Sequence, residues 1–280
     1  MRQLVNFWVD RLVKLDPDGM EAFGRAVAAP VRWLEWSLAA APPWLLLACV
    51  AGLAWRVGRS VPFAGAMAAI LGAVWLLGQW TEAMRSLALV VVAVALAVAI
   101  GLPLGIAGAR YPRFGQVARI VYDLMQTIPS FVYLIPAAML LGLGTAPALF
   151  ATLIVAIPPV ARLTDLGLRT VGDAERDAAR ALGLSPRLSL WLVELPLARP
   201  SIMAGINQSV MTALGMVVIA SMIGAKGLGE TVLVGLQRSD AGQGVVGGLG
   251  IVLLAILVDR LTQAAGRPRW LGELDRPAGR

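Results

Sequence analysis

Long apolar segments alternate with short polar ones along most of the chain. Seven apolar runs, each of roughly 17 to 24 residues, lie at about 38–55, 61–80, 86–109, 120–143, 145–161, 201–223 and 243–259. An α-helix rises about 1.5 Å per residue, so runs of this length match a hydrocarbon core of about 30 Å. The pattern therefore predicts an all-α polytopic membrane protein with about seven transmembrane helices.

The first 37 residues have a different character, because they are amphipathic and contain as many acidic as basic side chains. Leu4, Trp8, Leu12 and Leu15 fall on one helical face, and Pro17 ends this pattern. Residues 1–37 are interpreted as a helix that lies on the membrane surface. A poorly ordered tail is the alternative interpretation.

Proline and glycine interrupt several of the apolar runs. Pro129 and Pro136 lie in the fourth run, and Pro158-Pro159 is expected to end or kink the fifth. Such breaks fit helices that line a moving pathway, but irregular packing would produce them as well. Two small-residue pairs predict close helix packing: Gly101 with Gly105, and Gly244 with Gly248.

The charged residues indicate a topology. The chain has 24 Lys and Arg against 17 Asp and Glu, and most arginines lie after the first, third and fifth runs and in the C-terminal tail. The first three segments follow odd-numbered runs, so they share one side of the membrane. The C-terminal tail follows the last run, and it lies on that same side only if the total number of spans is odd. The positive-inside rule then places the N-terminus outside and the C-terminus in the cytoplasm, and explains the positive charge without nucleic acid.

The composition also excludes several kinds of chemistry. The chain contains no histidine and one cysteine, Cys49, which lies in an apolar run. Histidine-dependent zinc sites and Ser-His-Asp triads are therefore impossible, and no metal site is expected. A GxSxG motif is missing as well, which argues against an intramembrane enzyme.

One polar segment, "DAARALGLSPRLSLWLVELP" at 177–196, separates the fifth and sixth runs. Asp173 can cap a first short helix, and Gly183 can take the left-handed position that ends it. Ser185 can cap a second helix with Pro186 at its first position, and this helix is expected to stop before Pro196. The segment is predicted to be two short helices joined by a tight turn, placed in the cytoplasm by the charge pattern.

The same segment resembles the EAA motif of bacterial ABC importer permeases. Asp177-Ala178-Ala179 is followed by Gly183 and then by Leu195-Pro196, with Asp in place of the usual Glu. Segments 123–147, 158–171, 200–230 and 247–267 are similar to the permease subunit of glycine betaine/proline betaine importers, in the family of binding-protein-dependent transport system inner membrane components. The similarity covers about residues 85–267.

The resemblance implies a type I ABC importer permease fold with a cytoplasmic coupling-helix loop at about 172–196. Residues 81–263 would be the permease core and 264–280 a cytoplasmic tail, while 38–80, outside the similarity, are predicted from their apolar runs to be peripheral transmembrane helices. Separate ABC ATPase subunits would bind the loop, a binding protein would deliver a quaternary ammonium osmolyte from outside, and two permease copies would pair in the lipid membrane. The coupling residues would be Asp177, Ala178, Ala179, Ala181, Leu182, Gly183, Leu195 and Pro196.

ATP chemistry is expected on the partner chain. This sequence has no GxxxxGK[ST] phosphate loop, so it needs no cofactor of its own, and ATP and Mg²⁺ would bind the ATPase subunit. The alternative hypothesis is a self-contained secondary transporter of small zwitterions. Such proteins often show inverted repeats and buried charges, and the sequence shows no clear repeat and few charges inside the runs.

Polar residues inside the apolar runs are candidates for the wall of a translocation path, because such groups tend to face a bundle interior or a watery cavity. Hydrogen bonding between helices is the alternative for each of them. The candidates are Gln126, Thr127, Ser130, Tyr133, Asn207, Gln208, Ser209, Thr212 and Ser221. Asp123 is expected to pair with Arg119, four residues earlier. The Gly-rich stretch 224–244 is interpreted as a binding-protein contact, an outer gate or a flexible connector.

Overall fold

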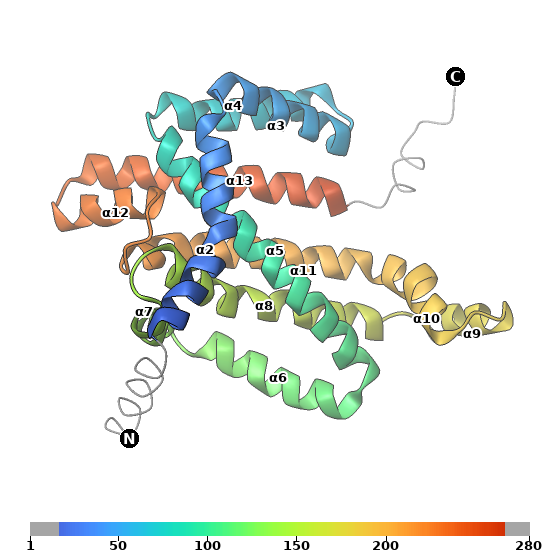
Figure 1. Ribbon diagram of the computed structural model, residues 1–280. Coiled ribbons are helices and arrows are strands. Elements are labelled where there is room, and N and C mark those ends of the chain that lie inside the picture. The colour runs from blue at the N-terminus through green and yellow to red at the C-terminus, as the bar shows by residue number, and fades with distance from the viewer. Residues whose placement is uncertain (1–16, 267–280) are drawn as a thin grey trace, which may run out of the picture.

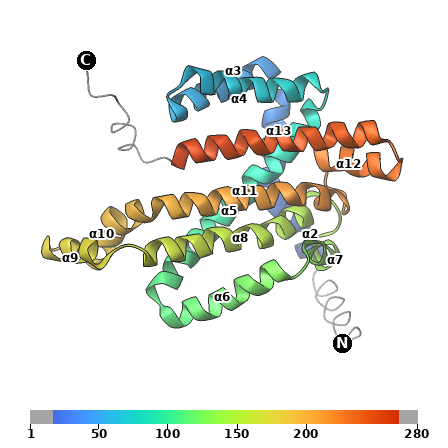
Figure 2. The same cartoon turned by 180° about the vertical axis from the view of Figure 1, so that it is seen from behind.

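The computed structural model describes residues 17–266, and every regular element in that range is a helix. The centre of the bundle is formed by three long helices, α5 (Trp80–Arg110), α8 (Thr145–Arg169) and α11 (Leu195–Ser221). Helix α13 (Ala241–Gly266) packs on the other side of α11. Figure 2 shows α13, α11, α8 and α6 following one another across the molecule.

Small residues allow α5 and α8 to pack closely. A Cβ atom built on Gly105 would lie 2.5 Å from the Ala161 carbonyl oxygen, and one on Gly101 would lie 3.0 Å from Val160. The first predicted small-residue pair is therefore a true contact surface. In the second pair, a Cβ built on Gly244 or Gly248 would meet open space, but the Gly244 backbone nitrogen lies only 2.5 Å from a Cβ built on Gly235 of the facing helix, so only Gly244 takes part in close packing.

Fewer helices are long and apolar enough to cross a membrane than the sequence pattern predicted. Within residues 17–266, four helices are long and apolar enough to cross a membrane, or up to six if each of two bent helix pairs is one span. Helix α4 (Val61–Leu76) has 16 residues, which gives a length of only about 24 Å. The expectation of seven full-length spans is therefore not confirmed.

The first bent pair changes the account of the N-terminal region. Helix α2 (Pro17–Ala40) starts at the proline that was expected to end a helix, and the pattern over residues 4–15 lies outside the described residues. The predicted run 38–55 is divided at residues 41–42, after which α3 (Pro43–Gly58) leaves at 109° to α2. Helix α2 runs across α5 and the start of α8, as Figure 1 shows.

One face of α2 is held against the bundle and another is open. Val31 is buried among α5 and α8 residues, and Glu35 pairs with Arg85 at 3.0 Å. Trp33 and Trp36 are about 70% exposed on a different face of the same helix. An exposed indole face is typical of a membrane interface.

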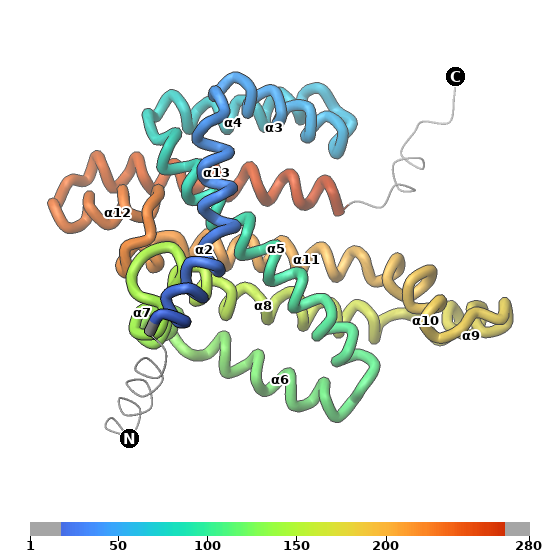
Figure 3. Tube along the Cα trace, in the orientation of Figure 1, coloured from blue at the N-terminus to red at the C-terminus, as the bar shows by residue number. Residues whose placement is uncertain are grey.

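The second bent pair interrupts the predicted run 120–143. Helix α6 (Pro112–Thr127) ends before Pro129, and a short 3₁₀ turn, η1 (Ser130–Tyr133), leads into α7 (Leu134–Leu141) at 98° to α6. Ile128 is extended (ψ 126°), as expected for a residue that precedes a proline. Figure 3 shows the sharp change of direction between α6 and α7.

Pro158 and Pro159 do not end helix α8, which continues to Arg169. Both rings are buried between neighbouring helices, and such packing compensates for the hydrogen bonds that proline cannot make. The predicted end of this run near residue 161 was therefore wrong by about two helical turns.

The Gly-rich stretch 224–244 is not a simple connector. It contains α12 (Leu228–Gln237), which folds back against α13. Leu228 is fully buried, and its backbone N–H donates to Ser86 Oγ at 2.9 Å. The hairpin of α12 and α13 lies at the end of the bundle opposite α9 and α10 (Figure 1).

Candidate coupling loop and translocation pocket

The segment between α8 and α11 forms the predicted pair of short helices. Helix α9 (Asp173–Ala181) is capped by Leu182 and followed by Gly183, whose φ of +73° is the left-handed conformation that glycine adopts at low cost. The Gly183 N–H donates to Arg180 O and the Leu184 N–H to Ala179 O. These two bonds define a Schellman motif, so the turn is fixed by local chemistry.

The start of the second short helix also follows the prediction. Ser185 Oγ accepts a hydrogen bond from the Leu188 N–H, and Pro186 is the first residue of α10 (Pro186–Ser189). The start of the first helix differs, because Gly172 is its N-cap and Asp173 is its first helical residue. The Asp173 carboxylate makes no capping bond, although its charge still suits the positive end of the helix dipole.

The predicted stop before Pro196 was wrong. Helix α10 continues through η2 (Leu190–Glu194), a π-helical turn, directly into α11, so the helical run extends from Pro186 to Ser221. Pro196 is the second residue of α11 and directly follows the π-helical turn. Leu195, expected as the last residue before a break, lies inside this continuous run.

Helix α9 has one side chain buried against the protein and several that are exposed. Ala179 is buried, whereas Asp177, Ala178 and Ala181 are exposed. Leu182, just after the helix, is 79% exposed. The helix end therefore exposes small side chains and one open leucine. Figure 1 shows α9 and α10 beyond the ends of the long helices.

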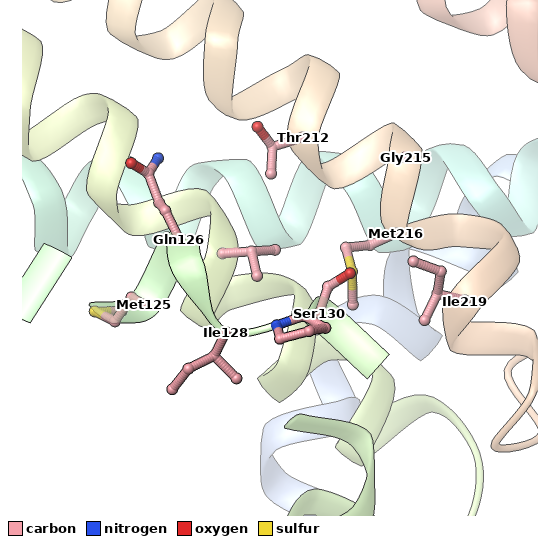
Figure 4. A pocket seen from close by; sticks show the side chains of 10 residues that line it. Met125, Gln126, Ile128, Ser130, Thr212, Gly215, Met216 and Ile219 are labelled. Atoms are coloured by element: carbon pink, nitrogen blue, oxygen red, sulfur yellow. The ribbon is translucent and has the colours of Figure 1, made fainter. Parts of the chain in front are cut away.

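A pocket of about 410 Å³ lies where α6 breaks, between that break and α11. Three predicted path residues line it: Gln126, Ser130 and Thr212. Figure 4 shows them around the pocket with Met216 and Ile219 of α11. The lining contains no charged and no aromatic residue, and its remaining members are Met125, Ile128, Pro129, Val155 and Gly215.

The other predicted path residues do not line this pocket. Ser209 is fully buried and donates to the Ala156 carbonyl, so it joins α11 to α8, as the alternative interpretation allowed. Thr127 and Ser221 donate to carbonyls of their own helices, and Tyr133 Oη donates to Met125 O at 3.0 Å across the break. Gln208 is exposed, and its carbonyl accepts from Thr212.

Asn207 differs from the others, because its Oδ1 atom is buried and has no hydrogen-bond partner within the described chain. It does not line the pocket.

Most ion pairs among α6, α8 and their neighbours were not predicted from the sequence. Asp123 pairs with Arg162 of α8 rather than with Arg119. Arg119 instead lies 3.8 Å from Asp165, a buried residue that also accepts from Arg169 at 2.6 Å. No local spacing signals the contacts between helices, because the partners come from different elements.

Residues 17–266 contain no group of three or more His, Cys, Asp or Glu side chains that could hold a metal ion.

Comparison with known sequences and structures defines the class. A family model described as "binding-protein-dependent transport system inner membrane component" matches residues 101–267. The chain belongs to this family, which makes it a multi-pass inner-membrane transport subunit of the ABC permease type.

Two curated relatives illustrate the similarity. The chain is 41% identical over 267 residues to the glycine betaine/carnitine transport permease protein GbuB of Listeria monocytogenes, covering 92% of this chain and 93% of the relative. It is 50% identical over 215 residues to the glycine betaine/proline betaine transport system permease protein ProW of Escherichia coli, covering 77% of this chain. That alignment spans 60% of the length of ProW.

The fold also matches a solved structure. An inward-facing structure of the MetNI methionine ABC transporter superposes with a TM-score of 0.58, covering 73% of this chain and 99% of that chain at 22% identity. This match confirms the predicted all-helical permease fold.

Proposed function

We propose that the chain is the membrane-spanning subunit of an ATP-driven importer for glycine betaine, proline betaine or a related quaternary ammonium osmolyte. The observation that carries the proposal is the loop of α9 and α10, which presents Leu182 and a locally fixed Gly183 turn beyond the bundle. The names of the GbuB and ProW relatives support the class of substrate.

Asp177, Ala178, Ala181 and Leu182 form the proposed contact with a cytoplasmic ATPase subunit, since all four are exposed. Gly183 fixes the turn, Ala179 anchors the helix from its buried side, and Leu195 and Pro196 continue it into α11. ATP and Mg²⁺ bind the ATPase subunit in this proposal, and this chain supplies no cofactor.

The pocket beside the α6 break is the proposed part of the translocation path. Its lining is uncharged, and a charged wall would hold one end of a zwitterion tightly and slow its release. It also lacks the aromatic rings that usually bind quaternary ammonium groups. The path therefore suits passage rather than selection, which we assign to an extracytoplasmic binding protein. A second permease copy would close the path.

The charge pattern supports an orientation with the α9–α10 end in the cytoplasm. Arg110 ends α5, Arg113 lies in the first turn of α6, and Arg176 and Arg187 belong to α9 and α10. Cytoplasmic loops are enriched in such residues. The N-terminus would then be outside and the C-terminus inside. Helix α2, with Trp33 and Trp36 exposed, would lie in the membrane–water interface on the external face of the inner membrane.

The test is reconstitution in liposomes with the ATPase and binding protein, followed by measurement of glycine betaine uptake. We expect uptake that requires all three components and ATP on the ATPase side. Uptake by this chain alone, without ATP, would refute the proposal in favour of a secondary transporter.

A further inference from the structure

A single carboxylate lies between two arginines where the α9–α10 loop joins the bundle. Glu194 is the last residue of η2, and its side chain is only 14% exposed. Glu194 Oε1 lies 3.4 Å from Arg110 Nη2, at the end of α5, and Glu194 Oε2 lies 3.8 Å from Arg176 Nε, in α9. The acid therefore connects three elements that are distant in sequence.

The π-helical turn explains how Glu194 comes to face the protein. Pro196 has no N–H, and its ring would clash with the Leu192 carbonyl in a regular α-helix. The helix widens instead, and the Leu195 N–H donates to Leu190 O, five residues back. Trp191 and Leu192 are more than 60% exposed, whereas Glu194 is turned inward. Such π turns occur often at functional sites.

Each arginine also donates a hydrogen bond to a backbone carbonyl of another helix. Arg110 Nη2 donates to Pro186 O at 2.9 Å, at the first residue of α10. Arg176 Nη2 donates to Leu168 O at 2.7 Å, near the end of α8. Ser189 Oγ lies 3.4 Å from Glu194 Oε1. The cluster of Arg110, Arg176, Ser189 and Glu194 therefore ties α9 and α10 to the ends of α5 and α8.

Glu194 forms the ion-pair connection between α9 and the rest of the bundle. Among the described residues, the only ion pair that joins α9 to another element is Arg176–Glu194. All three charged side chains of the cluster are less than one-third exposed, so solvent screens them less than it screens surface pairs. Removing the Glu194 charge leaves Arg110 and Arg176, both partly buried, without this counter-ion.

We propose that Glu194 is a positioning residue that makes α9 move as one body with α5, α8 and α11 when an ATPase subunit pulls on the loop. The inference rests on the proposed function, because it names how the coupling loop is joined to the spans. Glu194 does not touch the transported solute; it acts through Arg110 and Arg176.

The test compares Glu194→Gln with the wild-type chain, each reconstituted with the ATPase and binding protein. Glutamine keeps the shape and its Oε1 can still accept from Ser189, while the charge and one acceptor oxygen are lost. We expect normal insertion, normal ATPase attachment and continued ATP hydrolysis, with at least threefold less glycine betaine transported per ATP. Glu21→Gln is the matched control, since Glu21 belongs to an exposed pair on α2 and should leave this ratio unchanged.

A second variant tests whether the effect passes through the ion pair. Arg176→Gln should lower the transport-to-ATP ratio as well, and adding it to Glu194→Gln should cause little further loss, because the pair is already broken. Fully additive losses would overturn the assignment. Spin labels on cysteines at Glu175 and Tyr111, in a Cys49→Ser background, should show a broader distance distribution in Glu194→Gln.

The outcomes separate this inference from the proposed function. A wild-type complex that shows no ATP-dependent uptake would refute the proposed function itself. A wild-type complex that transports normally, beside a Glu194→Gln complex with an unchanged ratio, would refute only the role of Glu194. Loss of thermal stability and ATPase attachment, with a normal ratio in the complexes that remain, would show a structural role alone and would also overturn it.

Discussion

The Gly183 turn allows the conformational requirement of the loop to be tested without a steric clash. Apart from its two chain neighbours, no atom of residues 17–266 lies within 4 Å of a Cβ built on Gly183, yet its φ is +73°. A substitution there therefore changes the backbone preference and little else. Left-handed backbone costs an L-residue about 1–2 kcal/mol, and a β-branched residue such as valine lies at or above the upper end of that range.

This cost translates into a measurable loss of partner affinity. A free energy of about 1–2 kcal/mol changes a two-state ratio by about 5–30-fold. If the turn is correctly folded in only a fraction of the molecules, the apparent affinity for the ATPase is reduced by that fraction. We expect the affinity of the permease for the ATPase subunit, and ATP-dependent uptake, to fall in the order Gly183, Gly183→Asn, Gly183→Ala, Gly183→Val. The loss should reach up to about 30-fold for valine.

The assay titrates purified ATPase onto permease in nanodiscs and measures uptake in parallel liposomes. Asparagine is the informative control, because it enlarges the side chain but tolerates the left-handed region better than alanine. Membrane insertion should be equal for all four chains. Wild-type affinity and uptake in Gly183→Val would refute the argument, as would a larger loss for asparagine than for alanine.

Three further predictions concern the bundle. Gly105→Leu should lower stability by about 1–3 kcal/mol or more through overpacking against α8, measured by thermal unfolding in detergent, while Gly244→Ala should leave it unchanged because its site is open. Glu35→Gln should increase hydrogen exchange in α2 by removing its partly buried ion pair with α5, whereas Glu21→Gln, in an exposed pair, should not. Gln126→Leu should reduce glycine betaine uptake about 2–10-fold, the loss of one hydrogen bond, with ATPase attachment retained; unchanged uptake would exclude Gln126 from the path.

Features that depend on neighbouring residues could be predicted from sequence. The Gly183 turn and the Ser185-Pro186 helix start follow from side-chain and backbone bonds within a few residues, and the structure contains both. The apolar runs also located the long central helices. Helix boundaries were predicted less well. Local sequence rules favour a helix end at Pro158 and Pro159, but burial between neighbouring helices allows α8 to continue through them.

Features that depend on distant contacts could not be predicted. The partners Asp123 and Arg162 are 39 positions apart, and Arg110 and Glu194 are 84 apart. A chain with 24 basic and 17 acidic residues allows far too many pairings for spacing to select one. Only three of the nine predicted path residues line the pocket, because membership depends on which face of α6 and α11 is turned toward the break.

Pro196 shows how one local signal can support two different structures. Sequence rules favour a helix end at such a residue, because proline removes a hydrogen bond and crowds the preceding turn. The chain has a second way to relieve that crowding, which is to widen the turn and continue. A continuous helix from Pro186 to Ser221 is a stiffer link between loop and span than a helix that stops and restarts. The same widening turns Glu194 toward Arg110 and Arg176. The Leu-Pro pair of the motif therefore acts on the loop by shaping the helix that supports it.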